Sequence, residues 1–144
     1  MTSRVAIREF RGEYGFLSNF YVDTDGKTAE HLFQLNKATN DKDRTYVLRA
    51  KSPREAKRRG REIQLRSDWD RVKDQIMLDI IRMKFIHNKI LADMLLDTYP
   101  LELIEGNTWG DTYWGIDLHT GEGENKLGKI LMQVRDELRA AQCR

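Results

Sequence analysis

A succession of helix signals between Thr28 and Pro100 limits the possible folds of this chain more than any other feature. Thr28 has a side chain that often caps the start of a helix, and Ser52 followed by Pro53 is the order typical of an N-cap and a first helical residue. Pro100 ends the last helix of this stretch, over KILADMLLDTY, because proline lacks the backbone N–H of a helix interior. So many helix boundaries predict a mainly α fold.

Two of the predicted helices carry an apolar face. The longest opens at Ser67 and the last is capped by Asn125, and in both the apolar side chains recur at the spacing that places them on one side of a helix. These side chains are Trp69, Val72, Ile76, Ile80 and Met83 in the longest helix, and Leu127, Ile130, Leu131, Val134 and Leu138 in the last. Both faces are predicted to pack into the core.

The strand signals are short. Alternation in RVAIREF (4–10) predicts one strand, FYVDTDG (20–26) predicts a second that ends in a turn, and LELIEG (101–106) predicts a third. Between the first two, RGEYGFLSNF (11–20) contains two glycines and several polar residues, and it is predicted to be a loop. The expected class is mainly α (α+β), a compact helical domain with a few short strands.

With 144 residues the chain fits one domain, 1–144, of typical globular composition: 40% of the residues are apolar and 33% are charged. No stretch approaches the ~18 uninterrupted apolar residues of a membrane span, and the N-terminus lacks the apolar core of a signal peptide. The lone Cys143 predicts a reducing environment, so we expect a cytoplasmic protein. The three histidines are scattered, so we expect no metal, and we expect no cofactor.

The first of three polar segments with features of a binding site runs from Phe16 to Phe20. Ser18 and Asn19 stand between the two phenylalanines, so a planar ring could stack on the aromatic side chains and hydrogen-bond to the polar ones. The alternative is a turn whose phenylalanines fill the core. Phe16, Ser18, Asn19 and Phe20 are therefore candidate substrate contacts.

The second segment is EHLFQLNK. On one continuous helix, Glu30, Gln34 and Lys37 stand at i, i+4 and i+7 and share a face, with His31 beside them. If this face lines a cleft, Glu30 can act as an acid or base, and Lys37 as an anion clamp or a nucleophilic amine. The alternative is an ordinary exposed ion pair.

The third segment, WGDTYWG, is followed by the glycine-rich GEGENKLG. Trp109, Tyr113 and Trp114 could wall a pocket for a base, with Asp111 as a carboxylate inside it. The glycines before the last helix would let backbone N–H groups approach a phosphate, although two glutamates in the same loop oppose an anion. Asn125, where that helix begins, is a further candidate substrate contact.

Seven motifs, in this order and at fitting spacing, resemble the NADAR (YbiA-like) family: FLSNF, AEHLFQLNKA, SPREAKRRG, DWDRVKDQIM, MKF, YWG and NKLGKILMQVRDEL. The resemblance extends from about Phe10 to Leu138. It implies an α-rich single domain that cleaves the N-glycosidic bond between a ribose and a base or amine. Ala29 departs from the family pattern, which often has Ser or Thr at this position.

The resemblance implies two substrate classes, ADP-ribosylated guanine in nucleic acid and phosphorylated ribosylamino-pyrimidine intermediates of riboflavin synthesis. Cleavage builds positive charge on the sugar and needs a proton for the leaving nitrogen, so Glu30 and Asp111 are the candidate carboxyl groups. Lys37 offers a second route, through a Schiff base. The candidate ribose and base contacts are Asn19, Gln34 and Trp114, with His31 nearby.

The segment from Lys51 to Arg66 holds seven Lys and Arg against two Glu. It favours a phosphate-rich ligand such as ADP-ribosylated DNA, or a 5′-phosphate, and the alternative is a solvated basic helix.

Two further interpretations of the function of the chain stay open. A non-catalytic module that binds ADP-ribose or a nucleotide would not need Glu30 and Lys37, and a helical interaction domain would leave the aromatic loop unexplained.

Overall fold

The computed structural model describes residues 5–22 and 26–142, so Cys143 lies outside the described part. Helices dominate, and each described strand has only two residues, which confirms the mainly α class. The chain divides into two compact units, residues 19–80 and residues 1–18 with 81–144. The single domain 1–144 therefore remains a prediction.

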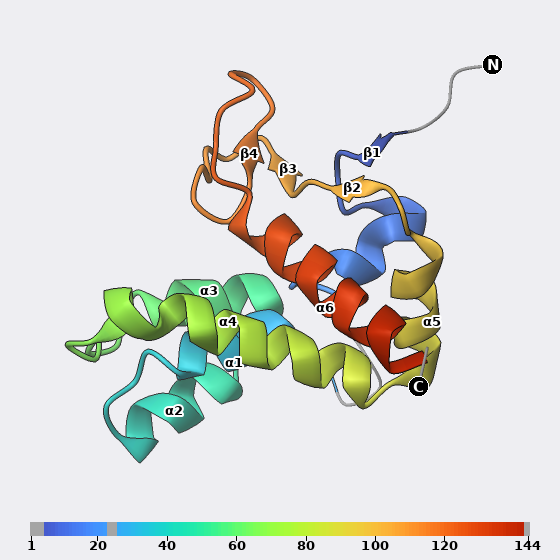
Figure 1. Cartoon of the computed structure of the whole chain (residues 1–144). Coiled ribbons are helices and arrows are strands. Elements are labelled where there is room, and N and C mark those ends of the chain that lie inside the picture. Colours follow the sequence, from blue (N-terminus) through green and yellow to red (C-terminus); the bar gives the residue numbers. More distant parts are fainter. Residues whose placement is uncertain (1–4, 23–25, 143–144) are drawn as a thin grey trace. The chain divides into compact units, whose positions relative to one another are not determined.

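Helices form the unit of residues 19–80. They are α1 (Ala29–Leu35), α2 (Asp41–Leu48), α3 (Pro53–Gly60) and the first part of α4 (Trp69–Ile86). The first helix, α1, packs against both α2 and α3 (Figure 1). A small core of Val47, Ala50 and Ala56 is buried in this unit, with Leu35 and Ile63 packed against it.

Capping side chains explain where these helices begin. Thr28 Oγ1 accepts a hydrogen bond from the His31 N–H (3.2 Å), and Ser52 Oγ accepts one from the Glu55 N–H (3.0 Å). Asn40 caps α2 in the same way. Such a bond satisfies an N–H group that has no partner within the helix. The predicted helix starts after Thr28 and Ser52 are thus confirmed.

The other unit contains the 3₁₀ helix η1 (Gly12–Leu17), the end of α4, and the helices α5 (Lys89–Asp97) and α6 (Lys126–Gln142). The last helix, α6, packs against α5 and against the strand β2 (Glu102–Leu103). Its buried face contains four of the five predicted side chains, Leu127, Ile130, Leu131 and Val134, while Leu138 is half-buried. The apolar face of the last helix is therefore confirmed.

Two pairs of parallel strands complete this unit. The strand β1 (Ala6–Ile7) pairs with β2, with Ile7 opposite Leu103. The strand β3 (Gly106–Asn107) pairs with β4 (Ile116–Asp117). The strands predicted at 4–10 and 101–106 are thus confirmed in shortened form.

Two predictions near the N-terminus are wrong. The segment 11–20 is not simply a loop, because hydrogen bonds from the Tyr14 N–H to Arg11 O and from the Ser18 N–H to Gly15 O wind most of it into η1. No strand forms at 20–22, where the chain turns and then runs irregularly, and 23–25 lie outside the described residues.

The longest helix also differs from its prediction. It begins at Trp69, because Ser67 lies in a turn, and Met83 on the predicted apolar face is 56% exposed. The buried side chains of α4 are Trp69, Met77, Ile80, Ile81 and Phe85. Apolar residues occur on more than one side of this helix, so periodicity alone could not identify the buried side. Phe85 is fixed by an edge-on contact with Phe16, at 6.5 Å between ring centroids.

Truncation of Leu131 is expected to destabilise the fold. Leu131 is fully buried on α6, so Leu131→Ala leaves a cavity and should lower the free energy of unfolding by ~2–5 kcal/mol. Leu65, which is 53% exposed, provides the matched control, because Leu65→Ala removes the same atoms from the surface. Thermal and urea unfolding measure both variants. Equal stability of the two would mean that the inward face of α6 is wrongly assigned.

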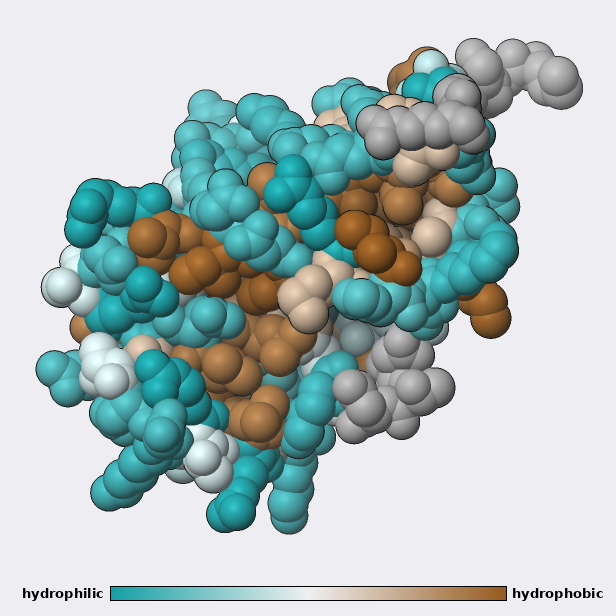
Figure 2. Space-filling model, turned by 60° about the horizontal axis from the view of Figure 1, so that its bottom comes forward, coloured by the Kyte–Doolittle hydropathy of each residue, from teal (hydrophilic) through white to brown (hydrophobic). Residues whose placement is uncertain are grey.

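The surface is chemically mixed. On the face drawn in Figure 2, apolar side chains lie among hydrophilic ones. Among the described residues, the large apolar side chains that are more than half exposed are Val5, Val22, Leu65, Met83, Ile86, Ile90 and Trp109. Within residues 5–22 and 26–142, no helix has the length and apolar character needed to cross a membrane.

Candidate active site

A buried polar pair, Glu30 and Gln34, lies on α1. Glu30 is 6% exposed and Gln34 is 4% exposed, and Gln34 Nε2 donates a hydrogen bond of 2.7 Å to Glu30 Oε1. The two residues are one helical turn apart, so their side chains meet on the same face, as predicted. An ordinary exposed ion pair does not describe this segment, because the carboxylate is removed from solvent and bound by an amide.

Asn19 joins this pair through the backbone. Its carbonyl oxygen accepts a hydrogen bond of 3.0 Å from the Glu30 N–H, and its side-chain Nδ2 lies 3.5 Å from Met77 Sδ. Asn19 is itself only 9% exposed. The backbone of Asn19 thus binds the start of α1 at Glu30, which in turn binds Gln34.

Two buried acceptor atoms of this group have no hydrogen-bond partner among the described residues. They are Asn19 Oδ1 and Gln34 Oε1. Leaving a buried polar atom without a partner typically costs about 1–3 kcal/mol, so an unpartnered pair of this kind needs an explanation. Both atoms only accept hydrogen bonds, so the group that would satisfy them carries N–H or O–H donors. Sugar hydroxyls are such donors.

Lys37 lies close to this group, although not on α1 as predicted. The helix ends at Leu35, where Asn36 Nδ2 binds Leu32 O (2.7 Å) and the Lys37 N–H turns back to Gln34 O (3.1 Å). The prediction of a continuous helix through Lys37 is therefore wrong, because the Lys37 N–H bonds to the carbonyl three residues back and not to the one four residues back.

The surroundings of Lys37 lower the pKa of its amine. Its Nζ lies 5.7 Å from the centre of the Trp69 ring, and the side chain is partly buried. Burial lowers the pKa of Lys37, and the charge of Glu30 acts in the opposite direction. Nearby cations, Arg61 first among them, lower the pKa further. A lowered pKa increases the fraction of unprotonated, nucleophilic amine near neutral pH.

His31 holds the helix start together. It is fully buried, and Nδ1 receives the Thr28 N–H (3.2 Å) while Nε2 lies 2.9 Å from Ala50 O. Because a carbonyl can only accept, Nε2 carries the ring hydrogen and Nδ1 is the acceptor. Both ring nitrogens are thereby used within the fold, so His31 supports α1 and the residues that α1 carries.

In the other unit, Asp111 organises the aromatic loop. Asp111 Oδ1 accepts hydrogen bonds from the N–H groups of Tyr113 (3.0 Å) and Trp114 (2.9 Å). The buried Asn107 binds the backbone of Asp111 through both its amide nitrogen (2.9 Å) and its amide oxygen (3.0 Å). One carboxylate oxygen of Asp111 thus fixes the course of the loop.

This arrangement predicts that two Asp111 variants will differ. Asparagine keeps an oxygen that can accept both N–H groups, so Asp111→Asn should retain the loop, whereas Asp111→Ala loses both bonds. If loop organisation is the main role of Asp111, Asp111→Asn keeps kcat/KM within about fivefold of wild type and Asp111→Ala falls well below it. A loss of roughly 10²-fold or more in Asp111→Asn would instead assign the carboxylate a direct part in the chemistry.

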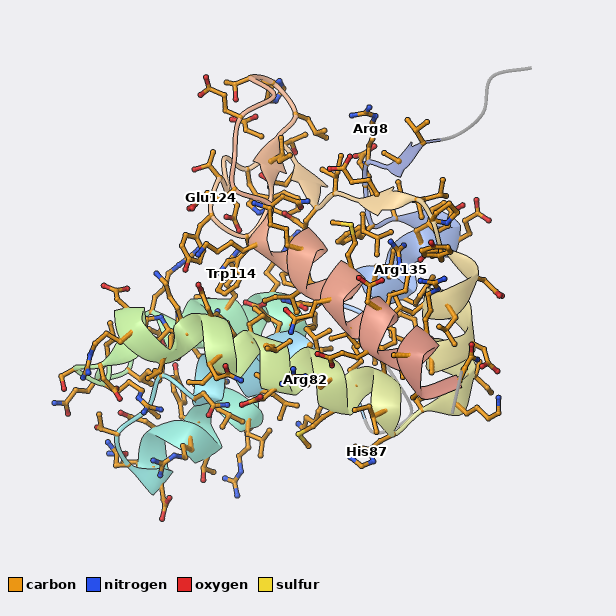
Figure 3. The ribbon with its side chains drawn as sticks, viewed as in Figure 1. Arg8, Arg82, His87, Trp114, Glu124 and Arg135 are labelled. Atoms are coloured by element: carbon orange, nitrogen blue, oxygen red, sulfur yellow. The ribbon has the colours of Figure 1, made fainter. Side chains whose placement is uncertain are left out.

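The aromatic side chains of this loop differ in exposure. Tyr113 and Trp114 meet edge to face, at 4.8 Å between ring centroids, and Lys126 Nζ lies 4.7 Å from the centre of the Tyr113 ring. Trp114 lies where the loop approaches α6 (Figure 3), and its carbonyl accepts the Leu127 N–H. Trp109 is 65% exposed. The backbone of Trp114 is thus tied to the start of α6 and to Asp111.

Asn125 begins α6 at a φ of 52°. Its Oδ1 accepts the Glu105 N–H and its Nδ2 donates to Leu103 O, both at 2.9 Å. The side chain therefore connects the start of α6 to the segment after β2. Asn125 thus holds the predicted position before α6, where its backbone O accepts the Lys129 N–H, but its side-chain oxygen binds the Glu105 N–H.

The two phenylalanines of the segment 16–20 differ: one fills the core, and the other is partly exposed. Phe16 is buried in the core against Phe85, as the turn alternative required. Phe20, in contrast, is 40% exposed. Ser18 is half-buried, and its carbonyl accepts Lys84 Nζ (2.9 Å).

Sequence reasoning missed two neighbours of the polar group on α1. Trp69 lies beside the Lys37 amine, and a Cβ at Gly60 would meet the Gln34 side chain. No local signal could have identified either contact, because both depend on how α3 and α4 meet α1. Within the described residues, no cluster of three His, Cys, Asp or Glu side chains could hold a metal ion.

Similarity to known proteins identifies the family of this chain. The NADAR domain matches residues 7–139. The chain belongs to the NADAR family of YbiA-like N-glycosidases. It is 41% identical over 134 residues to the N-glycosidase YbiA of Escherichia coli, a match that covers 88% of this chain and 82% of that protein.

Two further relatives and one solved structure are similar to this NADAR domain. An N-glycosidase of Nostoc punctiforme is 39% identical over 137 residues, which cover 88% of this chain and 86% of that protein. A riboflavin biosynthesis protein of Vibrio vulnificus is 40% identical over 133 residues, which cover 87% of this chain and 36% of that protein. The NMR structure of E. coli YbiA matches with a TM-score of 0.82 at 37% identity, covering 99% of this chain and 90% of that chain.

Proposed function

We propose that this NADAR protein hydrolyses the N-glycosidic bond between a ribose and a base or amine, with its reacting groups on and directly after α1. The observation that carries the proposal is the buried Glu30–Gln34 pair beside Lys37. A carboxylate, an amine of lowered pKa and the unpartnered acceptor oxygens of Asn19 and Gln34 are suited to a positively charged, hydroxyl-bearing sugar.

Each group has a defined part in this proposal. Asn19 Oδ1 and Gln34 Oε1 accept hydrogen bonds from ribose hydroxyls. The Glu30 carboxylate stabilises positive charge that develops at C1′ as the bond to nitrogen lengthens. The family resemblance is the reason to propose Trp114 as a base contact and Ser18, Phe20 and Asp111 as further substrate contacts, whereas Phe16 fills the core. His31 and Asn125 act indirectly, because their side chains bind the fold.

Lys37 is proposed as the nucleophile. Its Nζ bonds to C1′, the bond from C1′ to the base nitrogen breaks, and the sugar ring opens to an imine. Nζ loses two protons in forming the imine: Glu30 takes up one and passes it to the leaving nitrogen, and the other goes to the ring oxygen. Water then hydrolyses the imine, releasing the ribose and restoring the neutral amine. The alternative within the same site is direct attack by water, with Lys37 holding a phosphate or carboxylate.

Two substrate classes remain candidates for this site. The similarity to a riboflavin biosynthesis protein favours a phosphorylated ribosylamino-pyrimidine intermediate. The basic segment 51–66 is the observation that favours ADP-ribosylated guanine in DNA, since its cations suit several phosphates. A binding module without catalysis is disfavoured, because the similar chains of comparable length are N-glycosidases.

A two-substrate assay tests the proposal. The purified protein is incubated separately with a guanine-ADP-ribosylated oligonucleotide and with the ribosylamino-pyrimidine phosphate, and released sugar is measured by chromatography. Release from one substrate alone identifies the class. Glu30→Gln is the matched blank, since it distinguishes enzymatic release from spontaneous hydrolysis. Absence of release from both substrates would contradict the proposed function.

A further inference from the structure

Gly60, the last residue of α3, occupies an unusual place beside the Glu30–Gln34 pair. It is buried, and a Cβ atom built on it would overlap Gln34 Oε1 and lie 2.8 Å from Gln34 Cδ and 3.2 Å from Gln34 Cβ. The space that a side chain would fill at this position is therefore occupied by the Gln34 amide.

Backbone conformation does not explain this glycine. Glycine often ends a helix because it adopts positive φ, but Gly60 is not among the positive-φ glycines, and the following Arg61 has a right-handed helical conformation at φ −83°. An alanine would thus suit the helix at position 60 as far as the backbone is concerned. The contact with Gln34 is what sets Gly60 apart.

We propose that Gly60 is a positioning residue for the reaction, because its missing side chain leaves the space that keeps Gln34 bound to Glu30. This inference rests on the proposed function of that pair. In the observed orientation of the Gln34 amide, Gln34 Nε2 donates a hydrogen bond to Glu30 Oε1. In the same orientation, Gln34 Oε1 lies beside Gly60 as an acceptor without a partner. A methyl group at position 60 would push Oε1 away and turn Nε2 from the carboxylate.

The effect should be larger on activity than on stability. The atoms nearest to the added methyl group are the end of the Gln34 side chain, which can rotate away, while Gln34 Cβ at 3.2 Å requires only a small adjustment between α1 and α3. Gly60→Ala should therefore remain folded, with a moderate fall in melting temperature because Glu30 loses the Gln34 hydrogen bond, and should lower kcat/KM roughly 10–100-fold. Gly15→Ala is the matched control, because nothing lies within 4 Å of a Cβ at Gly15 and its φ is not positive.

A double-mutant cycle separates positioning from a merely structural role. Gln34→Ala removes the atoms that Gly60 accommodates, so Gly60→Ala in that background should change kcat/KM by less than about twofold. The substrate is whichever of the two candidate compounds the wild-type protein cleaves. A full additional loss in the Gln34→Ala background, or unchanged activity in Gly60→Ala alone, would overturn the proposal.

NMR provides a readout that does not depend on turnover. The side-chain NH₂ signals of Gln34, identified by their loss in Gln34→Ala, should shift in Gly60→Ala and stay in place in Gly15→Ala. Unshifted signals in Gly60→Ala would overturn the positioning role. If the wild-type protein cleaves neither substrate but these signals shift, the proposed function fails while the contact between Gly60 and Gln34 stands.

Discussion

Glu30→Gln is expected to lower kcat/KM roughly 10²–10⁴-fold while the protein remains folded. The substituted amide has almost the shape of the carboxylate, and its oxygen can still accept the hydrogen bond that Gln34 Nε2 makes at 2.7 Å. The substitution removes the negative charge that stabilises positive charge on the ribose ring. Because Glu30 is only 6% exposed, water has little access and cannot easily stabilise the ring in place of the carboxylate. Steady-state kinetics and a melting curve on the same preparation measure both parts of the expectation.

Glu9→Gln is the matched control for Glu30→Gln. Glu9 is exposed and forms an ion pair of 3.4 Å with Arg11, so its neutralisation should leave activity unchanged. Near-native turnover by Glu30→Gln would remove this carboxylate from the mechanism. A large fall in melting temperature would instead mean that the buried charge mainly supports the fold.

Lys37→Arg is expected to remove nearly all activity, on the order of 10³-fold or more, if the amine is the nucleophile. Arginine keeps the positive charge near the Trp69 ring but remains protonated and cannot attack C1′. Burial lowers the pKa of Lys37, which a nucleophilic amine needs and an anion clamp does not. Rapid mixing with excess enzyme would show whether the loss lies in bond cleavage or in substrate binding.

The control for Lys37→Arg is Lys42→Arg. Lys42 is exposed at the surface of α2, and the exchange there should change neither activity nor stability. A Lys37→Arg protein that keeps a sizeable fraction of its rate would favour the alternative in which Lys37 holds a phosphate and water attacks the sugar.

The sequence predicts correctly those features of the structure that depend on residues close together in the chain. The caps at Thr28 and Ser52 and the inward face of α6 follow from side chains within a few positions of each other, and the structure has them as predicted. The meeting of Glu30 and Gln34 was equally predictable, because residues four apart always share a helix face.

The remaining features depend on contacts between distant segments. The sequence predicts Lys37 on α1, but the helix ends before it, at Asn36. The Lys37 side chain is partly buried, and its amine lies over the Trp69 ring. His31 looked like a ligand contact in sequence, yet its ring bonds to Ala50, nineteen positions away. Asp111 looked like a catalytic acid, and only the structure shows that its Oδ1 binds two backbone N–H groups of the aromatic loop.

Trapping the covalent intermediate tests the central claim, the proposed attack by Lys37, most directly. Borohydride is added while the wild-type protein cleaves its substrate, and the digested protein is examined by mass spectrometry. The proposed mechanism predicts a reduced sugar adduct on the peptide that contains Lys37, and none in Lys37→Arg or without substrate, because only an imine between Nζ and C1′ can be reduced to a stable amine. Continued turnover without any adduct, together with an active Lys37→Arg protein, would contradict it.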